Sequence, residues 1–142
     1  MKTIILIFLV TTTTSIYSQT KEYAGIYKRH FDINEEGSIE YQLELSPDGT
    51  FTFHNYRKIS AKNREENQYG KGTWKIEKNK VLYFYTNKEN DLDEKYTLNF
   101  TNTKARYITK SPRDASEKEV KNHLRFYDSE ISWIKGNKLF RN

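Results

Sequence analysis

Apolar and polar residues alternate strictly in several short segments of the chain. In segment 38–45, every second position is apolar: Ile39, Tyr41, Leu43 and Leu45. Strict alternation is typical of a β-strand with one buried face and one solvated face. The pattern therefore predicts a half-buried strand here.

A turn sequence directly follows this strand. Segment 46–49 reads Ser-Pro-Asp-Gly, with proline and glycine at positions that tight turns favour. Segment 50–56 then alternates again, with Phe51 and Phe53 on the inner face. Together the two segments predict a β-hairpin. Further strands are expected over 23–29, 70–77, 81–85, 96–100, 105–110, 124–127, 130–134 and 138–140.

Two polar segments interrupt the strand pattern. Segment 57–69 is highly charged and is interpreted as a long loop. Segment 111–122 is interpreted as a loop with at most one short helix over 114–122, because Ser116 and Glu119 have the spacing of a helix-capping box. About eight or nine short strands with short connections predict an all-β domain, a single antiparallel up-and-down barrel.

The first residues have the organisation of a secretory signal peptide. Lys2 precedes an uninterrupted apolar run over 4–10, and small polar residues lead to Ser18 and Gln19. The run is too short to span a bilayer as a helix. We therefore expect a signal peptide over 1–18, cleavage between Ser18 and Gln19, and one domain over 19–142. A buried first strand is the alternative interpretation of the apolar run.

Composition narrows the function classes further. The chain has 142 residues, 24 Lys and Arg, 19 Asp and Glu, and no Cys. The absence of cysteine excludes disulfides, thiolate metal sites, a cysteine nucleophile and a lipidated cysteine anchor. Together with the expected signal peptide, this predicts a secreted or periplasmic protein with no lipid anchor. We also expect no transmembrane span, no cofactor and a monomer.

The motifs of the first strands resemble those of a known group. Gly25-x-Tyr27, segment 43–53 with its Leu-x-Leu-x-x-Asp-Gly-Thr-Phe-x-Phe pattern, and Gly72-x-Trp74 are similar to small exported lipocalin-like (calycin-type) β-barrel proteins of Bacteroidetes and flavobacteria. The resemblance covers most of 22–110. It implies a lipocalin-like barrel and assigns no activity, because most of these proteins have no known function.

Aromatic residues on the expected strands are the candidate ligand-binding set. In a small barrel such side chains either fill the interior or line a cavity, and the sequence leaves both open. Tyrosine is informative because a buried hydroxyl needs a partner, which a ligand can supply. The candidates are Tyr41, Phe53, Trp74, Tyr83, Tyr85 and Tyr96.

Other chemistries receive less support from the sequence. The three histidines, His30, His54 and His123, have no ligand spacing, so no metal site is predicted. No catalytic motif is present, so we expect no enzyme. Lysines alternate with acidic residues along the chain, and we expect no nucleic-acid partner.

Three functions therefore remain as hypotheses. The first is a binding module for a small, partly apolar ligand, with the 57–69 loop over the mouth of its cavity. The second is a filled barrel that binds or inhibits an envelope protein. The third and least favoured is an enzyme with a site carried by loops.

Overall fold

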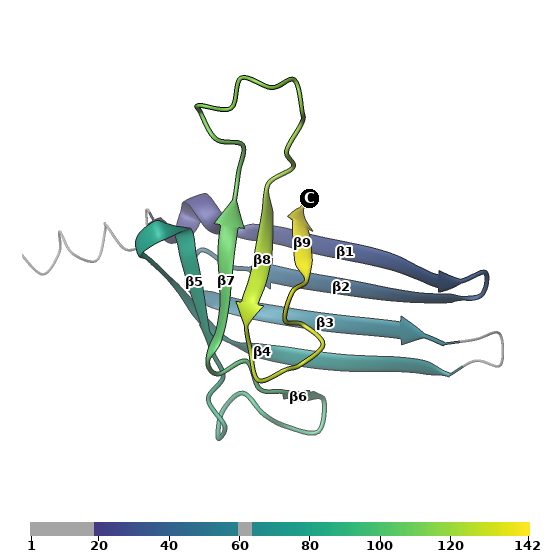
Figure 1. Ribbon diagram of the computed structural model, residues 1–142. Coiled ribbons are helices and arrows are strands. Elements are labelled where there is room, and N and C mark those ends of the chain that lie inside the picture. The colour runs from purple at the N-terminus through teal and green to yellow at the C-terminus, as the bar shows by residue number, and fades with distance from the viewer. Residues whose placement is uncertain (1–18, 60–63) are drawn as a thin grey trace, which may run out of the picture.

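The computed structural model describes residues 19–59 and 64–142, so the signal peptide expected over 1–18 lies outside the described residues. The fold is all-β, as predicted: a closed, eight-stranded antiparallel barrel with one extra strand and a short helix. Figure 1 shows the arrangement. The strands are β1 (Gly25–Asn34), β2 (Gly37–Leu45), β3 (Thr50–Lys58), β4 (Glu65–Glu77), β5 (Val81–Tyr85), β6 (Tyr96–Leu98), β7 (Thr103–Ile108), β8 (His123–Asp128) and β9 (Lys138–Arg141).

The barrel strands follow one another in chain order. Each pairs with the next, and β9 returns to β1 to close the ring, which confirms the up-and-down topology. The extra strand β6 lies outside this ring and pairs in parallel with β4. In the described part of the chain, no helix is both long and apolar enough to cross a membrane.

Strands β1 to β4 extend well beyond the rest of the barrel as a long sheet (Figure 1). The ladder between β3 and β4 continues as far as Lys58 and Glu65. The prediction of a loop over 57–69 is therefore wrong for 57–58 and 65–69, which belong to β3 and β4, whereas 60–63 lie outside the described residues. The polar sequence was interpreted as a loop because this end of the sheet projects past the core. Strand residues there carry charged side chains that remain solvated.

Segment 111–122 connects β7 and β8 as a projecting loop, and no helix forms over 114–122 (Figure 1). The Asp114 carboxylate accepts a hydrogen bond from the Ser116 backbone amide at 2.9 Å, a local turn that replaces the expected helix cap. The helical turns lie elsewhere, over 19–23 and in η1 (Lys78–Lys80).

The prediction of a strand over 130–134 is wrong, because these residues form a turn. The Ile134 backbone amide donates to the Ile131 carbonyl, and Gly136 adopts a positive φ of 88° and bonds back to Phe126. This turn places Ile134, which is fully buried, at one end of the barrel.

Aromatic side chains fill the barrel interior. Phe51 meets both Phe84 and Phe100 with ring centroids 5.2 Å apart, and Phe53 lies 5.0 Å from Phe100. Phe126 continues the cluster at 5.7 Å from Phe84. Burial of these rings, with leucines between them, is the main stabilising contribution to the fold.

A hydrogen-bonded group closes the barrel end beside the helix over 19–23. The Tyr27 hydroxyl donates to the Tyr23 carbonyl at 2.6 Å. The Arg141 guanidinium donates to the Ala24 carbonyl at 2.7 Å and to the Tyr107 hydroxyl at 3.1 Å. These bonds attach the start of the described chain to its last strand.

Candidate binding face on the outside of the barrel

The candidate residues separate into three groups. Tyr41, Phe53 and Trp74 are buried and belong to the core cluster. The Trp74 indole N–H donates to the Thr50 carbonyl at 3.0 Å and to the Ser46 carbonyl at 3.2 Å. Its polar atom is therefore satisfied by the backbone.

Tyr83 and Tyr85 point to the outside of the barrel instead. Strand β5 alternates, so Leu82 and Phe84 pack in the core while the two tyrosines face solvent. Segment 81–85 is apolar on both faces in the sequence, and the outer face proves to be aromatic surface. Tyr85 is 53% exposed.

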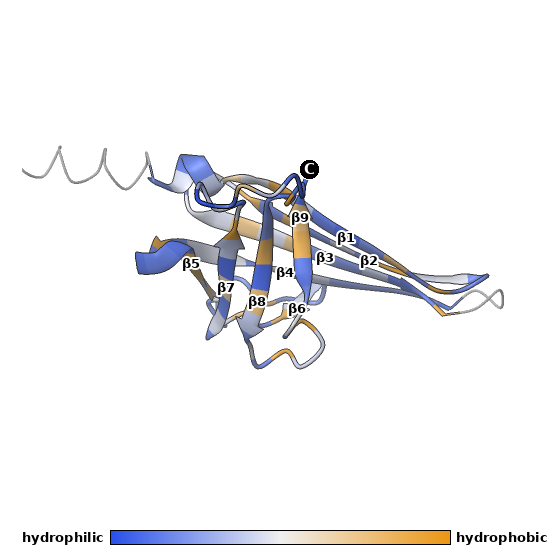
Figure 2. Ribbon diagram, turned by 45° about the horizontal axis from the view of Figure 1, so that its top comes forward, coloured by the Kyte–Doolittle hydropathy of each residue, from blue (hydrophilic) through white to orange (hydrophobic). Residues whose placement is uncertain are grey.

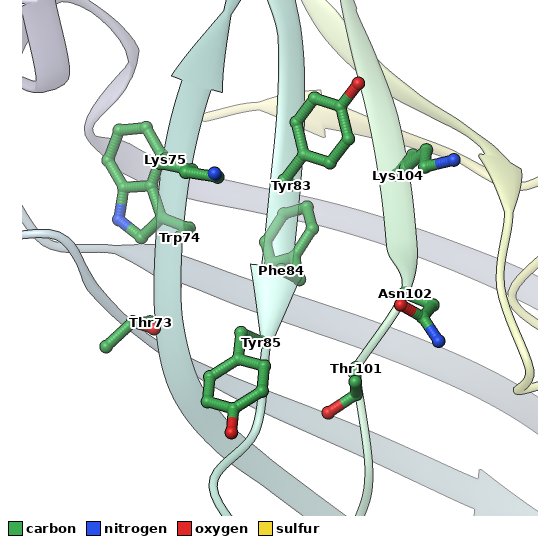
Figure 3. Close-up of a pocket in the computed structure, with 9 residues that line it drawn as sticks. All are labelled: Thr73, Trp74, Lys75, Tyr83, Phe84, Tyr85, Thr101, Asn102 and Lys104. Carbon is green, nitrogen blue, oxygen red and sulfur yellow. The ribbon is translucent and has the colours of Figure 1, made fainter.

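The outward tyrosines border a depression of about 310 Å³ over β4, β5 and the start of β7. Figure 3 shows its residues, with Tyr83 and Tyr85 on the middle strand. Its lining is mainly apolar, and polar groups of Thr73, Thr101 and Asn102 surround it.

Two lysines flank the Tyr83 ring. Lys75 on β4 and Lys104 on β7 are its direct cross-strand neighbours. Each ammonium nitrogen lies 5.8 Å from the ring centroid, within range of a cation–π interaction. The Tyr83 ring thus lies between two ammonium groups at the edge of the depression that it lines.

The same two lysines have acidic partners. Lys75 pairs with Glu77 at 3.0 Å, and Lys104 pairs with Asp128 at 3.3 Å. The hydrogen bond from Lys104 to the Asp128 carboxylate raises the pKa of the lysine. The depression therefore combines an aromatic wall with charges that are largely balanced.

Tyr96 lies in a separate group, beside the middle of β4. Its ring centroid is 6.0 Å from that of Tyr69, and the Lys71 ammonium lies 4.4 Å from the Tyr96 centroid. The His54 imidazole stacks on Tyr69 at 4.5 Å. The structure thus does not bring Tyr96 together with Tyr83 and Tyr85.

A row of cations next to the depression was not found from the sequence. Arg106, Arg125 and Lys138 are direct cross-strand neighbours on β7, β8 and β9, and all three are exposed. Figure 2 shows hydrophilic and hydrophobic segments alternating along β8 and β9. Alternation places each cation on the outer face, but only the strand order and register show that they are adjacent.

None of the salt bridges found within residues 19–59 and 64–142 involves this row. The Arg106 guanidinium carbon lies 5.7 Å from the ring centroid of Tyr127, which is 40% exposed. We call Arg106, Arg125 and Lys138 the basic row. It forms positive surface with an aromatic side chain beside it.

The three histidines lie in different surroundings. His30 pairs with Asp32 at 2.9 Å, His54 with Asn67 at 2.8 Å, and the His123 ring with the Lys121 carbonyl at 2.8 Å. Within the described ranges, no group of three or more metal-ligating side chains is found.

The structure thus defines a closed antiparallel barrel with a buried aromatic core and an aromatic, basic outer face. The chain matches no protein-family model, no curated protein and no solved structure. The resemblance to lipocalin-like proteins extends to the barrel itself, and membership of that group stays a prediction.

Proposed function

We propose that the protein is an exported, non-enzymatic binding module that holds a small, partly apolar ligand in the depression beside Tyr83. The single observation that carries this proposal is an open depression of about 310 Å³ whose mainly apolar lining includes the Tyr83 ring, with Lys75 and Lys104 on either side of it. The ligand site therefore lies outside the barrel and not in an internal cavity.

The filled core supports this location. The side chains of Phe51, Phe53, Phe84 and Phe100 contact one another across the interior. Insertion of a ligand there would require these rings to separate, which close-packed cores resist. The outer depression is already open.

The lining indicates the kind of ligand. The half-buried Tyr83 ring and the exposed Tyr85 ring offer apolar faces to a ligand, while the hydroxyl and amide groups of Thr73, Thr101 and Asn102 can bind its polar edges. A sugar ring has this combination, since its C–H face is apolar and its rim carries hydroxyl groups. We therefore infer that the ligand is a pyranose or a molecule of similar shape.

Export is part of the proposal. The residues after Ser18 pack against the barrel, since the Thr20 hydroxyl donates to the Pro47 carbonyl at 2.7 Å. Arg141 also donates to the Glu22 carbonyl at 3.1 Å. A chain cleaved after Ser18 would keep these contacts, so intact-mass measurement of the periplasmic or secreted protein tests the cleavage site.

Binding of methyl glycosides, followed by ligand-observed NMR, tests the site. We expect saturation transfer to a bound glycoside, strongest at its C–H face, and loss of that signal in Tyr83→Ala. Tyr96→Ala removes an equivalent aromatic side chain from the separate group and should leave the signal unchanged. Equal loss in both variants, or no transfer in the native protein, would contradict the proposal.

A second candidate function is a protein-interaction or inhibitor module. The filled barrel and the projecting sheet favour it, because Ile33 and Ile59 are exposed near the end of that sheet. Exposed apolar residues at such a position are typical of contact surfaces. Cross-linking in the envelope fraction with a photoreactive residue at position 33 tests it, with position 118 as the control.

A further inference from the structure

The basic row places like charges in direct opposition. Arg106 faces Arg125, and Arg125 faces Lys138, in the cross-strand register. Neighbouring strands lie about 4.8 Å apart, so three positive side chains leave the sheet at successive strand positions. Like charges directly opposite one another destabilise a sheet.

Nearby acidic groups do not balance the row. Asp128 is bonded to Lys104, and the Glu130 carboxylate accepts from the Asn102 amide at 3.1 Å. The salt bridges found among the described residues leave Arg106, Arg125 and Lys138 without an acidic partner. Their arrangement is unfavourable for stability alone, which indicates a role in binding an anion.

The row is continuous with the depression. Lys104, beside Tyr83, and Arg106 both face outward from β7, two residues apart. Tyr127 lies against Arg106 and adds an exposed ring at this junction. A ligand that begins on Tyr83 would reach the row if it were longer than one ring.

We propose that this outer face binds a linear acidic polysaccharide, with one sugar on Tyr83 and the carboxylates or sulfates of the following sugars on the basic row. The inference deepens the proposed function and rests on it. A sugar unit is about as long as the spacing between strands, so one negative charge per sugar can meet one cation per strand.

Two other polyanions fit this surface less well. The barrel is convex here, so a flat membrane would meet only part of a row that crosses three strands. A single-stranded nucleic acid would need successive aromatic platforms for its bases, whereas one cation–π contact, from Arg106 to Tyr127, is found for the row among the described residues. A flexible sugar chain can follow the curvature with its charges alone.

Calorimetric titration with tetragalacturonic acid, at low and at high salt, tests the proposal. The probe's fully methyl-esterified form has the same rings without the charges. We expect the acid to bind more tightly than the ester, with an affinity that falls as salt increases. Equal binding of acid and ester would overturn the inference.

The double variant Arg125→Gln/Lys138→Gln tests the row. Removal of two exposed charge contacts should weaken binding of the acid roughly tenfold and reduce its salt dependence, with binding of the ester unchanged. The matched control, Arg113→Gln/Lys118→Gln, removes two exposed charges from the 111–122 loop. Equal weakening in both would indicate an effect of net charge and overturn the inference.

Further measurements distinguish a failure of this inference from a failure of the proposed function. Tyr83→Ala should weaken binding of both acid and ester, whereas the row variant weakens only the acid. Loss of ester binding in the row variant as well would overturn the inference, because the row would then support the depression and not bind the charges of the ligand. Tighter row-dependent binding of an oligothymidylate, or of vesicles containing phosphatidylglycerol, would overturn the assignment to a polysaccharide.

Thermal unfolding keeps the test independent of folding defects. Because the row opposes like charges, the row variant should unfold at the same temperature as the native protein or at a higher one. Weaker binding in a protein that is equally or more stable is the expected result. A large drop in the unfolding temperature would show that the row is structural and would overturn the inference.

Discussion

Gly70 lies directly against the ring of Phe100. A Cβ atom on Gly70 would come within 2.6 Å of Phe100 Cε2, closer than carbon atoms can approach. Phe100 is fully buried and contacts Phe51, Phe53 and Phe84. The bare backbone of β4 at this position therefore allows the ring to enter the core.

Gly70→Ala should destabilise the protein by about 1–3 kcal/mol, because the added methyl group forces Phe100 or β4 to move. Urea unfolding measures the change in free energy. Thr73→Ala, at an exposed position of the same strand, should stay within about 0.5 kcal/mol of the native value. Equal stability of the Gly70 variant and the native protein would show that the core accommodates the methyl group without cost.

Arg141→Met should cost about 1.5–3 kcal/mol, because its charged hydrogen bonds to the Ala24 carbonyl and the Tyr107 hydroxyl are lost. Hydrogen exchange should then increase at residues 20–24 before it increases in the core strands. Uniform protection across the barrel would contradict the role of Arg141 in closing this end.

Stability should fall at alkaline pH through Tyr27. Burial raises the pKa of Tyr27 above its ordinary value of 10.0. The unfolded chain loses this proton more readily than the folded protein, so the stabilising contribution is complete below pH 10 and decreases as the pH rises further. Tyr27→Phe should have a flatter alkaline limb in urea unfolding, together with a lower stability at neutral pH from loss of the bond to the Tyr23 carbonyl. An unchanged alkaline limb would assign the effect to other tyrosines.

Arg125→Gln should stabilise the protein by about 0.2–1 kcal/mol, because it relieves repulsion from Arg106 and Lys138 on both sides. The difference should decrease as salt is added, since salt screens exposed charges. Thermal unfolding at several salt concentrations measures both effects. A destabilised variant would mean that the guanidinium makes favourable contacts that outweigh the repulsion.

The Asn55 amide gives a contrasting pair of variants. Asn55 Nδ2 donates to Gln68 Oε1 at 2.9 Å, while the buried Asn55 Oδ1 has no hydrogen-bond partner among the described residues. Gln68→Ala should therefore cost about 1–3 kcal/mol, because it leaves the whole buried amide unpaired. Asn55→Leu removes the unpaired oxygen and should cost less than Gln68→Ala in the same urea measurement. The reverse order would indicate that water satisfies Asn55.

The barrel itself was predictable because its strands carry strict alternation. The hairpin over 38–56 is confirmed, with Leu43 opposite Phe53 and Leu45 opposite Phe51. The start of β4 was missed because Glu65 and Glu66 lie on the projecting part of the sheet, where burial imposes no apolar pattern. Segment 130–134 was predicted to be a strand because Ile131 and Ile134 are apolar, but a turn that packs against the core also needs apolar residues.

The candidate site was predictable only in part. Segment 81–85 is apolar on both faces, so its pattern does not show which side chains face the core. Tyr83 and Tyr85 were expected to line a cavity of the barrel and lie on its outer face instead. The sequence could not show that Trp74 is satisfied by backbone carbonyls inside the barrel end. It also could not show that Arg106, Arg125 and Lys138 are neighbours. The first and last of them are 32 positions apart in the sequence, and they become adjacent only through the pairing of β7, β8 and β9.

Closure of the ring depends on β9, the last of the described strands. Its pairing with β1 joins Tyr27 to Arg141 and Lys28 to Phe140, residues from opposite ends of the domain. A chain that emerges amino-terminus first cannot make these contacts until nearly all of the domain is available. We therefore expect slow folding that is completed only after synthesis of β9, because the entropy of closing a long loop must be lost before the core contacts can stabilise the barrel. If the protein is exported as proposed, its chain would stay unfolded during translocation, because the pairing of β9 with β1 that closes the barrel could form only afterwards.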